Sequence, residues 1–108
     1  MSFYDRFILP RFIDFACGTE GFRNKRSQIL PMAYGDILEI GIGSGHNLEF
    51  YDETKVKTVR GIDPAEPSIK IAKQRLQNYN FPIKLDIGIA ENLPYEDQSF
   101  DSVVIGYS

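Results

Sequence analysis

Short apolar runs alternate with amphipathic stretches through the last two thirds of the chain. The runs at 37–40 and 58–62 are each followed by turn-forming residues, so they predict buried strands that end there. A helix of one to three turns is expected between them, near Asn47–Glu53. After the second run, Pro67 occupies a first-turn position and apolar residues recur on one helical face. This pattern predicts an amphipathic helix that ends near Asn78–Asn80.

The last two apolar segments differ in pattern. Isoleucine and leucine occupy every second position over 83–89, which predicts a strand at the edge of a sheet, with one face less buried than the other. Residues 103–105 are continuously apolar, which predicts a central strand covered on both faces. Strands that alternate with helices predict an α/β fold with a doubly wound parallel sheet, here in the spatial order 3-2-1-4. Ligands bind such sheets at the carboxyl ends of the strands, at the switch between strands one and four.

Residues 1–35 follow a different pattern. Aromatic residues recur at spacings of three to seven positions and Pro10 interrupts them, which predicts two short amphipathic helices. These helices form either a lid packed on the sheet or a membrane-surface or substrate-gating element, because basic residues follow the aromatic stretch. We therefore divide the chain into an N-terminal helical segment, 1–35, and an α/β half-domain, 36–108.

Length and charge limit the function classes. The 108 residues allow one domain, and their 12 basic and 15 acidic side chains give a formal net charge of −3. The first 35 residues hold five basic and three acidic residues, so the acidity lies in the half-domain, which would repel a phosphate backbone. No nucleic acid partner is expected. Charged residues near the start argue against a signal peptide, and no apolar stretch is long enough to span a membrane, so we expect a cytoplasmic protein.

The candidate chemistry lies in a glycine-rich loop that follows the first strand. Gly41, Gly43 and Gly45 stand at alternate positions, where they remove side chains from the path of a ligand and permit sharp turns. The spacing differs from the GxGxxG of dinucleotide sites, because His46 occupies the third small position. Asp63 ends the second strand, 22 residues after Gly41, from where it could accept hydrogen bonds from both hydroxyls of a ribose. Its alternative role is to form the turn before the next helix.

Three segments together resemble the class I S-adenosylmethionine-dependent methyltransferases. The stretch LEIGIGSG at 38–45 is similar to the first motif of that family, and GID at 61–63 is similar to the second. AENLPYEDQSFDSVV at 90–104 resembles the loop and fourth strand of the branch with small-molecule and lipid acceptors. The resemblance covers about Asp36–Ile105 and implies a Rossmann-like fold with S-adenosylmethionine as the cofactor.

The resemblance also implies roles for individual residues. Glu39, Gly41 and Gly43 would shape the methionine pocket, Asp63 would hold the ribose, and the loop after the third strand would lie beside the adenine. Ile89 replaces an Asp found in many relatives, so a side-chain hydrogen bond to the adenine amino group is not expected. The full expected set of cofactor-binding residues is Glu39, Gly41, Gly43, Ser44, Gly45, His46, Asp63, Pro64, Ala90 and Glu91. No catalytic base and no metal site are assigned, and His46 is expected to be structural or to contact the cofactor carboxylate.

The sequence thus predicts S-adenosylmethionine-dependent methyl transfer to a small-molecule or lipid acceptor. The alternatives are a nicotinamide or other nucleotide-binding Rossmann domain and a non-catalytic interaction module of the same fold. The later strands of the family would follow Ser108, so we expect this chain to carry the cofactor-binding half and to be inactive as an isolated monomer. The outer edge of its fourth strand would then be unpaired, which predicts self-association. The aromatic, mildly basic N-terminal segment favours peripheral membrane contact.

Overall fold

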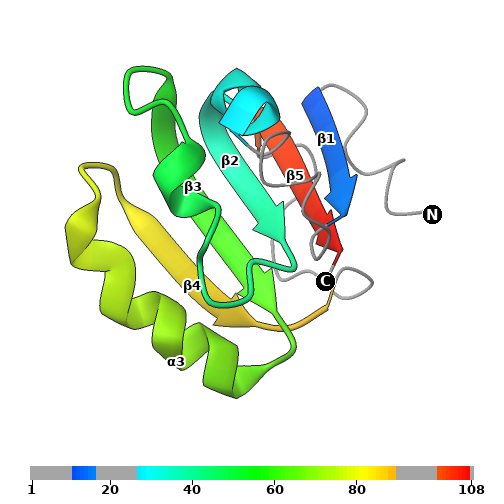
Figure 1. Ribbon diagram of the computed structural model, residues 1–108, viewed down its shortest axis with the longest axis vertical. Coiled ribbons are helices and arrows are strands. Elements are labelled where there is room, and N and C mark those ends of the chain that lie inside the picture. The colour runs from blue at the N-terminus through cyan, green and yellow to red at the C-terminus, as the bar shows by residue number, and fades with distance from the viewer. Residues whose placement is uncertain (1–10, 17–26, 90–99, 108) are drawn as a thin grey trace.

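A parallel sheet of five strands forms the centre of the molecule (Figure 1). The computed structural model describes residues 11–16, 27–89 and 100–107, and the side chains of 27–89 and 100–105. The strands are β1 (Arg11–Ala16), β2 (Gly35–Ile40), β3 (Val56–Asp63), β4 (Ile83–Ile87) and β5 (Ser102–Tyr107). Their order across the sheet is β1-β5-β2-β3-β4.

The predicted order of the four strands of the half-domain is confirmed. The expected strands one to four are β2, β3, β4 and β5, and they lie in the order 3-2-1-4 when read from the edge. The alternating strand β4 is at the edge of the sheet, whereas the continuously apolar β5 lies between β1 and β2. Apolar side chains on both faces of a strand therefore identified the interior positions of the sheet.

The prediction of helices in the N-terminal segment is wrong for Arg11–Ala16. These residues form β1, which pairs with β5 from Arg11 opposite Ser102 to Ala16 opposite Tyr107. Apolar and aromatic residues three positions apart suit a helix, but they also suit a strand when a sheet edge is available to pair with them. The remainder of 1–26 lies outside the described residues.

This pairing also corrects the prediction of self-association. The outer edge of β5 was expected to be unpaired, but the backbone of β1 is hydrogen-bonded along it. The unpaired edge was the basis for expecting contact between copies of the chain. The described structure removes that basis.

The helix that follows β3 agrees with the sequence pattern, whereas the helix expected before β3 is shorter than predicted. α3 (Glu66–Arg75) continues into the 3-10 turn η3 (Leu76–Asn78), as the helix from Pro67 was predicted to do. An acidic first turn and a basic last turn match the helix dipole of α3. The helix expected near Asn47–Glu53 is the single 3-10 turn η2 (Leu48–Phe50), and another such turn, η1 (Leu30–Met32), precedes β2.

The two faces of the sheet are packed to different extents. On one face, α3 lies across β3 and β4 (Figure 1), and its Ile69 joins Ile37 and Val59 in the larger apolar core. On the other face, a smaller core consists of Leu38, Ile40, Ile62, Phe100 and Val103. Successive residues such as Ile37 and Leu38 pack on opposite faces of the sheet, because side chains alternate in direction along a strand. Among the described residues, no helix has the length and apolar character needed to cross a bilayer.

Candidate functional site

The glycine loop makes a sharp turn where β2 ends. Gly41, Gly43 and Gly45 have positive φ angles of 75°, 57° and 85°, which residues with a side chain adopt only at a cost in free energy. The amides of Gly41 and Ile42 both donate to the carbonyl of Ile62 on β3, at 2.9 and 3.2 Å. The loop therefore lies against the carboxyl end of β3, beside the topological switch where α/β sheets bind ligands.

Gly43 and Gly45 have different surroundings. Among the described residues, no atom would lie within 4 Å of a Cβ atom on Gly43, so this part of the loop is open toward them. A Cβ atom on Gly45 would instead lie 3.2 Å from the Leu48 side chain and 3.4 Å from Cβ of Ala72. Gly45 thus permits close packing against η2 and α3, whereas Gly43 leaves room for a ligand to approach the backbone.

Asp63 connects the loop to the turn that follows β3. Its Oδ2 accepts a hydrogen bond from the amide of Gly43 at 2.9 Å, and its Oδ1 accepts one from the amide of Ala65 at 2.8 Å. The turn-forming role considered for Asp63 is therefore present, together with a contact to the glycine loop. Each carboxylate oxygen can accept a further hydrogen bond, and the side chain is only half-buried. The predicted ribose contact is compatible with this geometry.

Glu39 is fully buried, one residue before the end of β2. Its Oε1 accepts a hydrogen bond from the Tyr51 hydroxyl at 2.6 Å, and its Oε2 accepts one from Nδ2 of Asn47 at 2.9 Å. Burial raises the pKa of the Tyr51 hydroxyl well above its usual value, and the negative charge and hydrogen bond of Glu39 raise it further. Tyr51 therefore stays protonated and remains a donor.

Sequence reasoning missed Asn47 and Tyr51. Both are buried, and both lie just beyond the loop, on either side of η2. Their spacing of four positions was visible in the sequence, but nothing local indicated that they turn back toward Glu39. The signal that could have found them is a buried acid before the loop, because a buried carboxylate needs hydrogen-bond donors.

The other predicted site residues are only partly brought together. Gly43 and Asp63 are in direct contact, as described above. Ser44 is half-buried, whereas His46 and Pro64 are exposed. Ala90 and Glu91 lie outside the described residues, so their predicted place beside the adenine stays a prediction.

Exposed apolar side chains lie at the end of β4, beside Asp63. Ile87, which pairs with Asp63 in the sheet register, is 56% exposed, and Ile89 is 48% exposed. The amide of Gly88 between them donates to the carbonyl of Asp63 at 3.1 Å. The carboxyl edge of the sheet therefore combines a carboxylate with apolar surface, which suits a ligand that has both a hydroxylated and an aromatic part.

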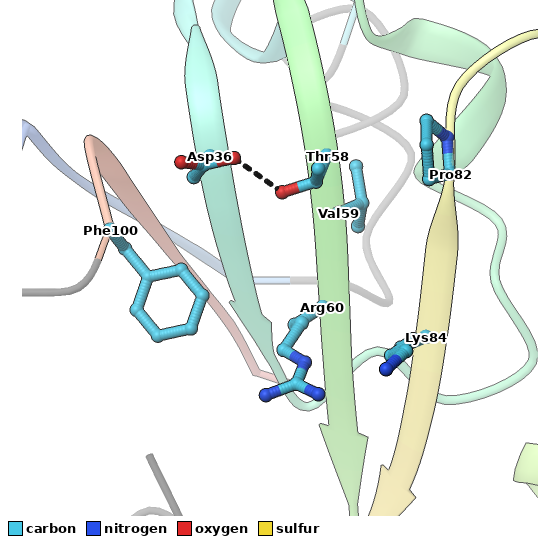
Figure 2. A pocket seen from close by; sticks show the side chains of 7 residues that line it. All are labelled: Asp36, Thr58, Val59, Arg60, Pro82, Lys84 and Phe100. Carbon is cyan, nitrogen blue, oxygen red and sulfur yellow. Dashed lines mark hydrogen bonds between the residues drawn. The ribbon is translucent and has the colours of Figure 1, made fainter. Parts of the chain in front are cut away.

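A hollow of about 290 Å³ lies elsewhere on the molecule, toward the amino ends of the strands. Figure 2 shows Asp36 of β2 bonded to Thr58 of β3, with Arg60, Lys84 and Phe100 further along the hollow. The glycine loop and Asp63 do not line it. The hollow is therefore separate from the candidate site. Within the described residues, no three His, Cys, Asp or Glu side chains are grouped as metal ligands.

The fold and the loop together define a Rossmann-like domain whose candidate ligand site lies at the carboxyl ends of β2 and β3. Comparison with known families agrees, since the model of the methyltransferase domain family matches residues 37–108. The chain belongs to this methyltransferase family. The predicted class, S-adenosylmethionine-dependent methyltransferases, is confirmed at this level, and the nicotinamide-binding alternative receives no support from the match.

Individual relatives are similar over part of their length. The ubiquinone/menaquinone biosynthesis C-methyltransferase UbiE of Campylobacter jejuni is 34% identical over 77 residues, covering 66% of this chain and 31% of that protein. The demethylmenaquinone methyltransferase of Thermotoga maritima is 25% identical over 113 residues, covering 99% of this chain and 48% of that protein. The solved structure of the YcgJ protein from Bacillus subtilis superposes with a TM-score of 0.59 at 26% identity, covering 79% of this chain and 36% of that one. The chain thus spans 31% of the length of the first of these relatives and 48% of the length of the second.

Proposed function

We propose that this chain carries the S-adenosylmethionine-binding part of an enzyme that transfers a methyl group to a small-molecule or lipid acceptor. The observation that carries the proposal is the arrangement of Gly43 and Asp63. No described residue occupies the space beside the Gly43 backbone, and the Asp63 carboxylate next to it can accept further hydrogen bonds, both at the switch point of the sheet. Family membership supplies the identity of the cofactor.

Each part of the site has a task in this proposal. The absence of side chains at Gly41 and Gly43 lets the cofactor approach the backbone, and Asp63 accepts hydrogen bonds from its ribose hydroxyls. The exposed Ile87 and Ile89 offer apolar surface to its base. When bound, S-adenosylmethionine supplies a methyl group already activated by the sulfonium. The chain therefore has to position donor and acceptor rather than activate the methyl group, and it needs a base only where the acceptor must lose a proton.

The acceptor class rests on the relatives and on the sequence. Two relatives are named for ubiquinone/menaquinone biosynthesis and for demethylmenaquinone methylation, which supports a small-molecule or lipid acceptor. The acidic half-domain does not favour nucleic acid. We further propose that the protein is cytoplasmic and makes peripheral contact with a membrane.

The test is transfer of a labelled methyl group from S-adenosylmethionine to small-molecule and lipid fractions, including a demethylated quinone, by the enzyme of which this chain is the proposed cofactor-binding part, because the chain alone is expected to be inactive. We expect label in an organic-soluble product, and we expect Asp63→Ala to reduce its rate of formation at limiting cofactor. Label that appears only in protein or nucleic acid fractions would overturn the proposed acceptor class. The matched control is Asp101→Ala, because Asp101 also binds a backbone amide, that of Asp36 at 2.8 Å, at the opposite end of the sheet.

A further inference from the structure

We propose that Asn47 and Tyr51 are positioning residues that hold the glycine loop in its cofactor-binding shape through the carboxylate of Glu39. The proposal rests on the proposed function, because it concerns the same cofactor site. Neither residue belongs to the glycine motif, and neither was expected to take part in cofactor binding.

The three side chains close the loop on itself. Glu39 precedes the loop, whereas Asn47 and Tyr51 follow it, and their hydrogen bonds of 2.9 and 2.6 Å join the two ends. The turn η2 is held by the amide of Phe50, which donates to the carbonyl of Asn47 at 3.0 Å. Between these ends, Gly43 is fixed to Asp63. The loop is therefore held at both ends by Glu39 and at its middle by Asp63.

The cluster is buried, so its hydrogen bonds decide its stability. Glu39 is 0% exposed, and Asn47 and Tyr51 are each 5% exposed. On the neighbouring strands, Gly61 and Val104 pair with Glu39 and bring no charge. Asp63 binds the loop at Gly43, and His46, next to Asn47, is exposed. A carboxylate that is buried away from water is stable only when hydrogen-bond donors contact it. Asn47 and Tyr51 are two such donors.

The orientation of Asn47 indicates that the carboxylate determines it. A carboxylate only accepts hydrogen bonds, so Asn47 must turn its amide nitrogen toward Glu39. Its Oδ1 is then buried and finds no hydrogen-bond donor among the described residues. An unpaired buried carbonyl costs free energy. If this position only had to fill space in the core, an apolar residue would do so without that cost. The geometry therefore assigns Asn47 to holding Glu39.

The decisive variant is Asn47→Asp, which keeps the shape of the side chain but places a second carboxylate against Glu39. Two carboxylates this close share one proton, so the cluster forms only where that proton is bound. We expect the affinity for S-adenosylhomocysteine to fall about tenfold or more near pH 8 and to recover near pH 5.5, while the wild type changes about threefold at most over this range. Calorimetry measures the affinity, and circular dichroism at each pH confirms that the variant is folded.

The chain offers a matched control and a rescue. Asn80 donates to Glu53 at 3.2 Å on the surface, so Asn80→Asp makes the same change outside the site and should leave binding unaltered. The double variant Glu39→Gln with Asn47→Asp exchanges the amide and the carboxylate. It restores the hydrogen bond between the two positions, so we expect affinity near pH 8 to return to within about threefold of the wild type.

Tyr51→Phe provides an independent test, including the case in which Asn47→Asp does not fold. It removes one donor from Glu39, and we expect the affinity for S-adenosylhomocysteine to fall about fivefold. Tyr79→Phe is its control, because Tyr79 contacts Phe81 through its ring and lies outside the cluster.

Two results would overturn the proposal. One is a folded Asn47→Asp or Tyr51→Phe protein that binds S-adenosylhomocysteine as tightly as the wild type near pH 8. The other is a loss of affinity in Asn47→Asp that neither acid nor the exchanged pair restores. Failure of the proposed function is distinguishable, because in that case the wild type itself would not bind S-adenosylhomocysteine.

Discussion

Glu39 and Asp63 are two carboxylates at the ends of adjacent strands, yet their environments are opposite. Glu39 is fully buried, and its recorded partners are the side chains of Asn47 and Tyr51. Asp63 is half-buried, and its partners are two backbone amides, those of Gly43 and Ala65. The first carboxylate is enclosed by the protein, and the second is partly exposed.

This difference separates two tasks within one motif. A buried, fully partnered carboxylate fixes the shape of the loop, whereas a half-exposed one with spare lone pairs can also bind a ligand. Substitution of Glu39 should therefore act first on folding, and substitution of Asp63 should act first on binding.

The largest effect is expected for Glu39→Ala. The change removes a buried side chain and leaves the Tyr51 hydroxyl and the Asn47 amide without their acceptor, so it should lower the free energy of unfolding by roughly 3–5 kcal/mol. Urea denaturation measures this loss. Glu39→Gln, which keeps the shape and one acceptor, should lose less, and equal losses for the two variants would argue against the buried hydrogen bonds.

Asp63→Ala should weaken binding of S-adenosylhomocysteine by one to two orders of magnitude, on the order of 1.5–3 kcal/mol, because charge-assisted hydrogen bonds to the ribose are lost. The fold should persist, since the partners of Asp63 are amides near the surface of the site. Calorimetry measures the affinity, and Asp101→Ala is the matched control. Unchanged affinity in folded Asp63→Ala protein would reassign the side chain to the turn alone.

Gly43→Ala and Gly45→Ala separate the two sides of the loop. Both positions have positive φ, so each alanine should cost about 1–2 kcal/mol of stability. Gly45→Ala should cost more, because its Cβ would also press on Leu48, whereas Gly43→Ala should mainly obstruct the cofactor. Thermal unfolding with and without S-adenosylhomocysteine distinguishes these outcomes. If S-adenosylhomocysteine stabilised Gly43→Ala more than Gly45→Ala, this would contradict the assignment of Gly43 to the cofactor side of the loop.

The smallest effect is a pH dependence of stability that comes from Tyr51. Its pKa is raised in the folded state, so the stabilisation it contributes is complete below the usual value of 10.0 and is lost as pH rises toward the folded-state pKa. Between pH 10 and the folded-state pKa of Tyr51, the free energy of unfolding should therefore fall with a slope of at most about 1.4 kcal/mol per pH unit from this group alone. In Tyr51→Phe, the free energy of unfolding, measured by urea denaturation at each pH, should change less with pH above 10. A pH dependence identical to that of the wild type would show that Tyr51 is not the cause.

Most of the sheet could be predicted from the sequence, for a physical reason. β2, β3, β4 and β5 are each a short apolar segment bounded by turn residues, and the amount of polar alternation in β4 and β5 indicates edge or interior positions. β1 could not be predicted in this way. Its strand conformation depends on pairing with β5, which lies at the other end of the sequence, and its own residues fit a helical spacing equally well.

The site was predictable to a similar extent. The sharp turn at the glycines follows from chemistry that is visible in the order of residues, because such a turn requires positive φ, whereas the contact of Asp63 with a ribose stays a prediction. Asn47 and Tyr51 do not follow, since their approach to Glu39 depends on the path by which the chain turns back to the end of β2 after the glycine loop, which no local pattern specifies.

The measurement that tests the central claim most directly is calorimetric titration of the protein with S-adenosylhomocysteine and, separately, with NAD. The loop spacing, the position of Asp63 and the family match predict saturable binding of S-adenosylhomocysteine at one site per chain and no binding of NAD. Binding of NAD without binding of S-adenosylhomocysteine would contradict the account, because the same fold would then serve a different nucleotide.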